Sequence, residues 1–130
     1  MRGIITLLVC LAPICGLAAD VPSGTWRVEQ IALELYPCDQ AACGKIVWVQ
    51  NPAKRHLCGR VIIWGLTSDG SPQWSGGQFY DPENDKTYDL NARVESHDLI
   101  AARIYKGVPL IGRTEILTRI PSHSLAGWCA

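Results

Sequence analysis

The chain has 130 residues, about the length of one domain, and its twelve basic and twelve acidic residues leave no net charge. Lysines and arginines are scattered singly along the sequence, so no basic patch indicates binding to nucleic acid. No amphipathic helix indicates binding to a membrane surface, and charge therefore points to no partner.

The first nineteen residues differ from all that follow. Met1 and Arg2 give a short positive start, residues 3–14 are almost entirely apolar, and residues 16–19 supply small side chains at a plausible cleavage site. This is the anatomy of a secretory signal peptide, and the run is shorter than the ~20 apolar residues that a permanent bilayer span needs. A lipoprotein with lipidated Cys15 is the alternative, but the bulky Ile14 precedes that cysteine. We expect residues 1–19 to be a signal peptide and residues 20–130 to be a single exported domain.

Four cysteines remain after cleavage, Cys38, Cys43, Cys58 and Cys129. An even number in a small exported domain predicts two disulfides. Of the three possible pairings we favour Cys38–Cys43 with Cys58–Cys129, because the first two flank a predicted hairpin turn. A zinc site fits poorly, since it needs reduced thiolates and the Cys-x4-Cys spacing leaves Cys58 unmatched.

Short segments in which apolar and polar residues alternate follow one another through residues 20–130. Ile31, Leu33 and Leu35 show this period of two, which is typical of half-buried antiparallel strands. Turn residues such as those at 69–72 separate the segments, and a helical period appears only weakly, at 52–57. The pattern predicts eight strands, over residues 24–29, 30–37, 44–50, 60–66, 73–80, 86–94, 98–105 and 112–120.

Eight antiparallel strands joined by short turns leave two exposed edges unless the sheet closes on itself. We therefore predict an all-β, up-and-down antiparallel barrel around one core, with an open sandwich as the alternative. Segments 46–49 and 61–66 are apolar on both faces. They indicate strands that are covered on both sides or that line a pocket.

Two motifs at the ends of this domain are similar to those of the lipocalin and calycin barrels. Gly24-Thr25-Trp26 opens the first predicted strand, and Thr118-Arg119 closes the last. The resemblance implies that the Arg119 guanidinium lies across the Trp26 indole and seals one end of the barrel. A desolvated cation–π contact of this kind contributes about 2 kcal/mol.

A longer ordered set of motifs resembles the bacterial domain of unknown function 2147 family. The motifs are Leu35-Tyr36-Pro37-Cys38, residues 43–48, residues 74–83, Lys86-Thr87-Tyr88, residues 109–113 and Thr118-Arg119. The resemblance implies a bacterial secreted or periplasmic protein with a calycin-like barrel, and it implies no activity. Two positions depart from the family: Asn84-Asp85 replaces Asp-Gly in a turn, so one of them must adopt a positive φ, and Leu117 replaces an aromatic, which opens space near the sealed end.

Groups that could support catalysis or bind metal do not form a recognisable site. Asp81, Glu83 and Asp85 could bind calcium, but they lack the glycine and distal glutamate of a calcium loop, and a solvated turn explains them better. The three histidines fall in different predicted loops, and no serine has nucleophile context. We predict no enzyme activity, no metal and no cofactor.

The interior of an eight-stranded barrel can be filled by side chains or can hold one small ligand, and the sequence leaves both open. The glycines at 76 and 77 either bend the sheet or make room for a ligand. Because the domain is rich in tryptophan, we predict a small apolar or amphipathic ligand. A module that binds an envelope protein or acts as an inhibitor through loops 51–58 and 106–112 is the alternative. The predicted lining residues are Trp48, Trp64, Trp74, Tyr80, Tyr88 and Arg103.

Overall fold

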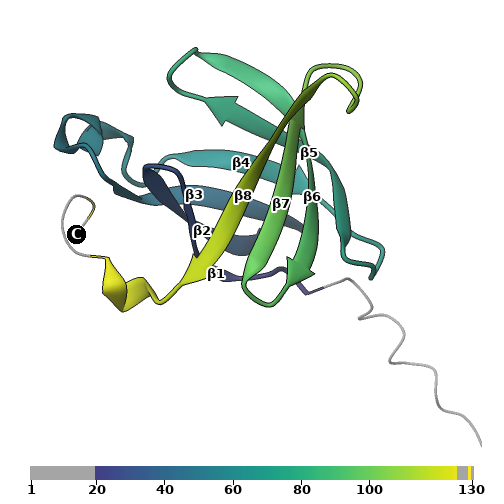
Figure 1. The fold of residues 1–130 in the computed structure, drawn as a ribbon, viewed down its shortest axis with the longest axis horizontal. Helices are drawn as coiled ribbons and strands as arrows, with labels where there is room; N and C mark the ends of the chain where they lie inside the picture. The colour runs from purple at the N-terminus through teal and green to yellow at the C-terminus, as the bar shows by residue number, and fades with distance from the viewer. Residues whose placement is uncertain (1–19, 126–128, 130) are drawn as a thin grey trace, which may run out of the picture.

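The computed structural model describes residues 20–125 and Cys129, and the predicted signal peptide lies outside the described residues. Eight antiparallel strands follow one another around a closed barrel (Figure 1). The strands are β1 (Gly24–Val28), β2 (Ile31–Cys38), β3 (Ala41–Val49), β4 (Val61–Leu66), β5 (Gln73–Asp81), β6 (Lys86–Ser96), β7 (Leu99–Tyr105) and β8 (Gly112–Ile120).

The predicted eight-stranded antiparallel barrel is confirmed, and every predicted segment overlaps one strand. The largest difference is at β3, which begins at Ala41 instead of residue 44. Asp39 and Gln40 both have positive φ, 51° and 65°. This is the backbone of a two-residue hairpin turn, which lets the strands pair immediately on either side of it.

The weak helical pattern at residues 52–57 corresponds to a short 3₁₀ helix, η2 (Pro52–Leu57). The Asn51 side chain accepts a hydrogen bond from the backbone N–H of Ala53, and Pro52 stands at the first helical position. Leu57 turns inward and is buried. The helix therefore covers the barrel where β3 passes into β4.

The barrel closes where β1 pairs with β8. Trp26 stands opposite Arg119 in that pairing, and the Arg119 Cζ lies 4.4 Å from the centroid of the Trp26 ring. Arg119 also donates hydrogen bonds to the carbonyl oxygens of Ser23 (2.7 Å) and His97 (2.8 Å). Trp26 is wholly buried, and its indole N–H donates to the carbonyl of Pro22. We call this the sealed end of the barrel; the contact is the one that the lipocalin resemblance implied.

Gly24 is part of the same seal. A Cβ at this position would lie 2.5 Å from Nη1 of Arg119, and the backbone has a φ of +132°. Only glycine adopts this conformation readily and leaves space for the guanidinium. The requirement for glycine at position 24 is thus explained by Arg119. The two residues are 95 positions apart in the sequence and become neighbours only in the folded barrel.

Both disulfides pair the cysteines that the sequence favoured. Cys38–Cys43 bridges the β2–β3 hairpin with Cα atoms 6.0 Å apart, and Cys58–Cys129 has Cα atoms 5.4 Å apart. The second bridge ties the end of η2 to a residue near the C-terminus, across 71 positions. Bridges that close long loops restrict the unfolded chain most.

The two mid-strand glycines of β5 fit the structural interpretation. The register of β5 against β6 shifts between Trp74 and Gly77, and Gly76 has a φ of +74°. A Cβ on Gly77 would lie 2.6 Å from Cγ of Leu66. The bare backbone therefore makes room for a core side chain of β4 at a β-bulge.

Candidate functional site

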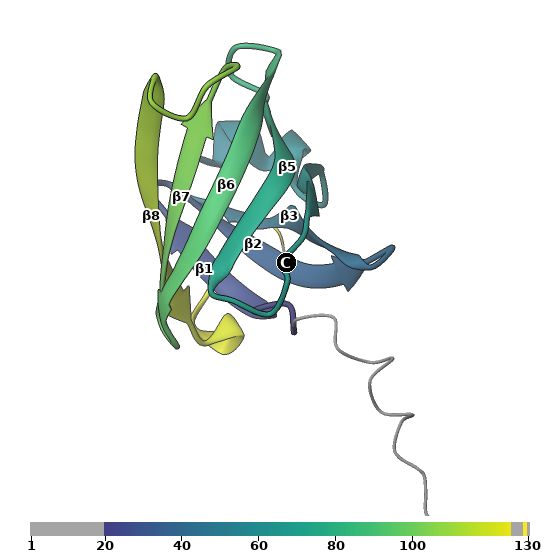
Figure 2. The same ribbon diagram turned by 90° about the vertical axis from the view of Figure 1, so that its right-hand side faces the viewer.

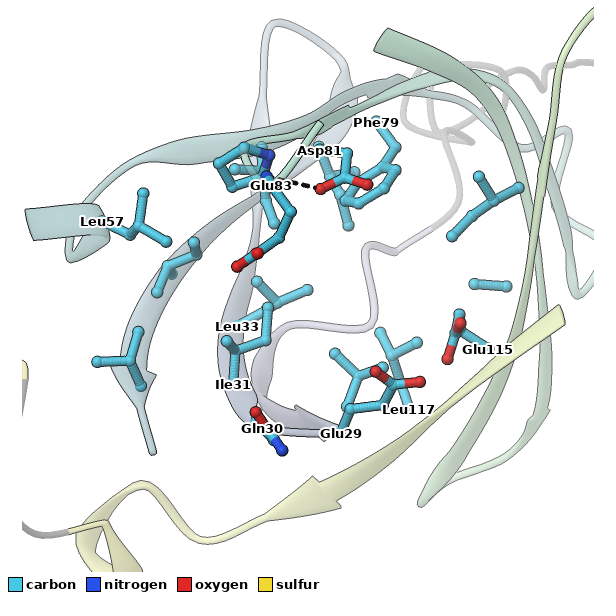
Figure 3. A pocket seen from close by; sticks show the side chains of 18 of the residues that line it. Glu29, Gln30, Ile31, Leu33, Leu57, Phe79, Asp81, Glu83, Glu115 and Leu117 are labelled. Carbon is cyan, nitrogen blue, oxygen red and sulfur yellow. Dashed lines mark hydrogen bonds between the residues drawn. The ribbon is translucent and has the colours of Figure 1, made fainter. Parts of the chain in front are cut away.

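A cavity of about 380 Å³ occupies the barrel interior (Figure 3), and its polar lining residues lie at the end opposite the Trp26–Arg119 seal. Side chains from most of the strands form its walls, and nearly all of the wall groups are aliphatic. The strands contribute inward positions because successive residues of a strand point to opposite faces. The apolar wall consists of Leu33, Ile46, Val49, Leu57, Ile62, Ile63, Phe79, Leu90, Ala102, Ile104 and Leu117.

The opening of the cavity, which we call the mouth, is formed by three connections between strands and by the first half of β8. The connections are the β1–β2 turn, η2 and the β5–β6 turn, and Figures 1 and 2 show the β5–β6 and β7–β8 connections at the same end of the barrel. Polar side chains stand here and not in the interior. The rim carries Glu29, Gln30, Asn51, Lys54, Asp81, Glu83, Arg113 and Glu115.

Asp81 fixes the shape of the β5–β6 turn. Its side chain is buried, with 8% exposure for the residue, and one carboxylate oxygen accepts the backbone N–H of Glu83 at 2.9 Å (dashed line in Figure 3). The other oxygen accepts the side-chain amide of Asn84, also at 2.9 Å. Asp85, with a φ of 56°, supplies the positive φ that the sequence required of Asn84 or Asp85. The buried carboxylate is thus satisfied by the turn that it shapes.

Glu83 leaves this turn and forms an ion pair with Lys54 of η2. The pair joins two of the three connections that stand at the mouth. Both side chains are more than one-third exposed, so the ion pair adds little to the free energy of unfolding. Its effect is to set the positions of the two charged groups at one side of the opening.

A second charged group lies across the mouth. Glu29 and Glu115 lie next to each other beside Leu117 (Figure 3), and Arg113 Nε donates to Glu115 Oε2 at 3.0 Å. Hydrogen bonding with Glu115, together with repulsion from it, raises the pKa of Glu29, while Arg113 acts in the opposite direction. The two carboxyl groups come from opposite ends of the sequence and meet only because β1 and β8 are neighbours.

The structure places the six predicted lining residues elsewhere. Trp48 lies on the outside of β3, where the guanidinium of Arg27 stacks over its ring at 4.6 Å, and it borders a shallow hollow with Val47 and Leu125. Trp64 is half-buried on β4 opposite Gln78. Trp74 is buried near the sealed end, beside Val21.

The other three predicted residues also have partners within the protein, and that of Tyr88 is a wall residue of the cavity, Phe79. Tyr80 donates a hydrogen bond to Asp85 (2.7 Å), which raises the pKa of the phenol, and Arg60 lies 4.5 Å above its ring. Tyr88 stacks on Phe79. Arg103 binds the β7–β8 loop. As ligand contacts these six residues stay a prediction, and the cavity is lined by other side chains.

The alternation of apolar and polar residues along the strands predicts the cavity lining better than the positions of the tryptophans do. In the β7 segment, Ile100, Ala102 and Ile104 form the apolar face of a strict alternation, and the last two line the cavity. Arg103 belongs to the opposite, polar face. Reading the aliphatic face of each strand as the interior therefore identifies more of the wall than selecting aromatic residues does.

Among the residues that the structure describes, no group of three potential metal ligands converges. Asp81 and Asp85 bind protein donors of their own turn, and Glu83 pairs with Lys54. The histidines at 56, 97 and 123 are exposed on η2, the β6–β7 turn and a short C-terminal 3₁₀ helix, η3 (Ser122–Ser124). Within the same described residues, no helix is long and apolar enough to cross a bilayer.

Residues 24–119 match the model of a bacterial family, which is described as an uncharacterized protein conserved in bacteria and numbered domain of unknown function 2147. The chain belongs to this family. The family resemblance found in the motifs is confirmed over the whole barrel. Leu117, which the resemblance implied to stand in place of an aromatic residue, lines the cavity.

Comparison of structures identifies the same barrel in a solved protein. Protein HP1028 from the human pathogen Helicobacter pylori, described as belonging to the lipocalin family, aligns with a TM-score of 0.66 at 15% sequence identity. The alignment covers 78% of this chain and 84% of that one. At this identity the likeness establishes a lipocalin-like fold. The search of curated proteins found no match.

Proposed function

We propose that this protein binds one small apolar or amphipathic molecule by enclosing it in the barrel. The observation that carries the proposal is the cavity of about 380 Å³, whose aliphatic walls open at one end to a charged rim. Its volume is near the lower end of the ~300–1,000 Å³ of typical ligand pockets. Eight-stranded barrels of the lipocalin type are wide enough to hold one such ligand.

The division between wall and rim suggests how the ligand lies. An apolar body in contact with Leu33, Ile46 and Ile104 would leave water, while a polar group would remain at the mouth. The rim carries four carboxylates, Glu29, Asp81, Glu83 and Glu115, against the two cations Lys54 and Arg113. A neutral or cationic polar group is therefore favoured over a carboxylate.

A pair of neighbouring alanines on β7 allows a matched test. Ala102 lines the cavity, whereas Ala101 faces the outside of the same strand. We expect Ala102→Phe to fill part of the cavity and to weaken ligand binding at least tenfold. Ala101→Phe adds the same ring to the outer face and should leave binding unchanged. Folding of both variants is checked by circular dichroism and thermal unfolding.

The probes are linear alcohols, amines and fatty acids of increasing chain length, measured by calorimetry or native mass spectrometry. Each added CH₂ that enters the wall region contributes about 0.8 kcal/mol, or roughly fourfold in affinity. Affinity should rise with chain length until the cavity is full, and the amine should bind more tightly than the fatty acid of equal length. Absence of binding by every probe, or equal weakening by both alanine variants, would contradict the proposal.

We also propose that the protein works in the bacterial periplasm or outside the cell and without catalysis. The bacterial family and the two disulfides support an oxidising compartment. The rim carboxylates are engaged by turn donors, by Lys54 or by one another, which supports a binding role more than acid–base chemistry. Mass spectrometry of the exported protein should give an N-terminus near residue 20; retention of residues 1–19 would contradict export by a cleaved signal peptide.

A further inference from the structure

The loop between β7 and β8, residues 106–111, ends in an exposed apolar tip beside the mouth. Val108, Leu110 and Ile111 are 51%, 88% and 70% exposed, and Pro109 lies between them. The loop projects from the mouth end of the barrel in both Figure 1 and Figure 2. Single exposed apolar residues are ordinary on protein surfaces, but a continuous group on one projecting loop indicates an interaction site.

The tip is held in a defined shape. The Arg103 guanidinium donates from Nε to the carbonyl of Pro109 (2.8 Å), from Nη2 to the carbonyl of Leu110 (3.2 Å) and from Nη1 to the Thr114 hydroxyl (3.1 Å). Within the loop, the backbone N–H of Ile111 donates to the carbonyl of Val108. These bonds use backbone carbonyls and fix the chain while its apolar side chains face solvent. A tip ordered in this way loses little conformational entropy when it binds.

Three cations and two acids stand at the base of the tip. The hydrogen bonds of Arg103 all go to uncharged groups, and Lys106 donates to the Thr87 carbonyl; neither cation forms an ion pair within the described residues. Arg113 is balanced by Glu115. Asp89, the other acid here, accepts the backbone N–H of Gly107. The cations thus outnumber the acids around an apolar tip.

An apolar tip with a cationic collar matches the interface of an anionic bilayer. Apolar side chains can enter the boundary between headgroups and acyl chains while lysine and arginine remain at the phosphates. We propose that the β7–β8 loop docks on an anionic lipid surface through its apolar tip and the cations Arg103 and Lys106. The proposal does not depend on a ligand in the cavity, because the tip lies outside it.

The test is flotation of the exported, disulfide-bonded protein with lipid vesicles. One set of vesicles is phosphatidylcholine alone, and the other contains phosphatidylglycerol as well. We expect the protein to float with the anionic vesicles, to bind the zwitterionic ones more weakly, and to dissociate as salt screens the collar. The double variant Leu110→Ser, Ile111→Ser should bind at least tenfold more weakly, since two apolar side chains no longer leave water.

The matched control changes two other exposed apolar residues in the same way. Val61→Ser, Ile116→Ser alters strand positions that are 42% and 48% exposed, and it should leave vesicle binding unchanged. The tip variant should fold, because the hydrogen bonds of Arg103 reach backbone carbonyls and the side chain of Thr114. Ala102→Phe, which tests the cavity, should bind vesicles like the unaltered protein.

Several outcomes would overturn the proposal. The unaltered protein could fail to float with either vesicle, the tip variant could bind as tightly as the unaltered protein, or binding could be independent of phosphatidylglycerol. If sedimentation velocity instead shows a dimer that the tip variant abolishes, the tip contacts a second copy of the chain. If the protein ignores vesicles but binds one envelope protein through residues 106–111, the loop is a protein-binding site.

Discussion

The two ends of the barrel are built from similar strands but differ in how their interiors are filled. At the sealed end, one wholly buried indole occupies the interior, and Arg119 covers it with hydrogen bonds to two backbone carbonyls. At the mouth, aliphatic side chains surround a cavity, and charged residues of three connections and of β8 stand around its opening. The sealed end is close-packed, and its polar groups form hydrogen bonds within the protein. The mouth is open to water and to a ligand.

This difference indicates that stability and binding are assigned to different parts of one barrel. The buried Trp26 and its cation make contacts that are lost only on unfolding, so the sealed end should dominate the free energy of unfolding. The charges at the mouth are exposed and screened, so changes there should act mainly on binding. Three substitutions test this division, from the largest expected effect to the smallest.

Removal of the indole at the sealed end should have the largest effect. We expect Trp26→Ala to lower the free energy of unfolding by about 3–5 kcal/mol, because it leaves a cavity in a close-packed region. Trp48→Ala removes the same side chain from the outside of β3 and should cost about 1–2 kcal/mol, chiefly through loss of the Arg27 contact. Urea unfolding followed by circular dichroism measures both. Equal losses would show that the seal has no special role.

Substitution of Gly24 should have an intermediate effect. Gly24→Ala places a methyl 2.5 Å from Nη1 of Arg119, so the guanidinium must move away from the Trp26 ring and from the Ser23 carbonyl. Gly70→Ala is the matched control, since Gly70 also has a positive φ, +107°, but its added Cβ meets nothing within 4 Å. In each variant the positive φ of a non-glycine residue lowers the free energy of unfolding by about 1 kcal/mol or more. Gly24→Ala should lose roughly 1–2 kcal/mol beyond the control, and thermal unfolding showing no difference would contradict this account.

The smallest effect is expected at the mouth. Hydrogen bonding with Glu115 and repulsion from it raise the pKa of Glu29 in the folded protein. The stability that the pair contributes is therefore fully present below the ordinary glutamate pKa and is lost as the pH rises through the raised value. We expect Glu29→Gln to raise the Tm slightly at pH 7 and to have no effect in acid, with the gain shrinking as salt is added.

Glu95→Gln serves as the control for that pH dependence, because Glu95 faces Arg93 and not another carboxylate. It should not raise the Tm at pH 7. A Tm for Glu29→Gln that is lower than that of the unaltered protein at neutral pH, or higher by the same amount at every pH, would contradict the proposed repulsion between Glu29 and Glu115.

The wall of the cavity was harder to predict than the barrel itself, and β3 shows why. Ile46 and Val49 both line the cavity although they are three positions apart, which strict alternation forbids. The register explains this: Leu33 stands opposite Ile46, but Ala32 stands opposite Trp48, so β3 holds one extra residue at a bulge. A shift of one residue moves every later side chain to the other face of the sheet. Trp48 is outside for this reason.

The sequence by itself determined the eight strands, the favoured cysteine pairing and the family. Alternation, turn residues and the order of motifs are properties of the sequence that can be recognised without knowing which residues are in contact. Only the tertiary structure decided which apolar residues face the cavity in the strands that are apolar on both faces, since bulges set the register there. It alone also assembled the rim, where Glu29, Glu83 and Glu115 come from three distant segments. Closure of the barrel brings these segments together, and no local pattern encodes that proximity.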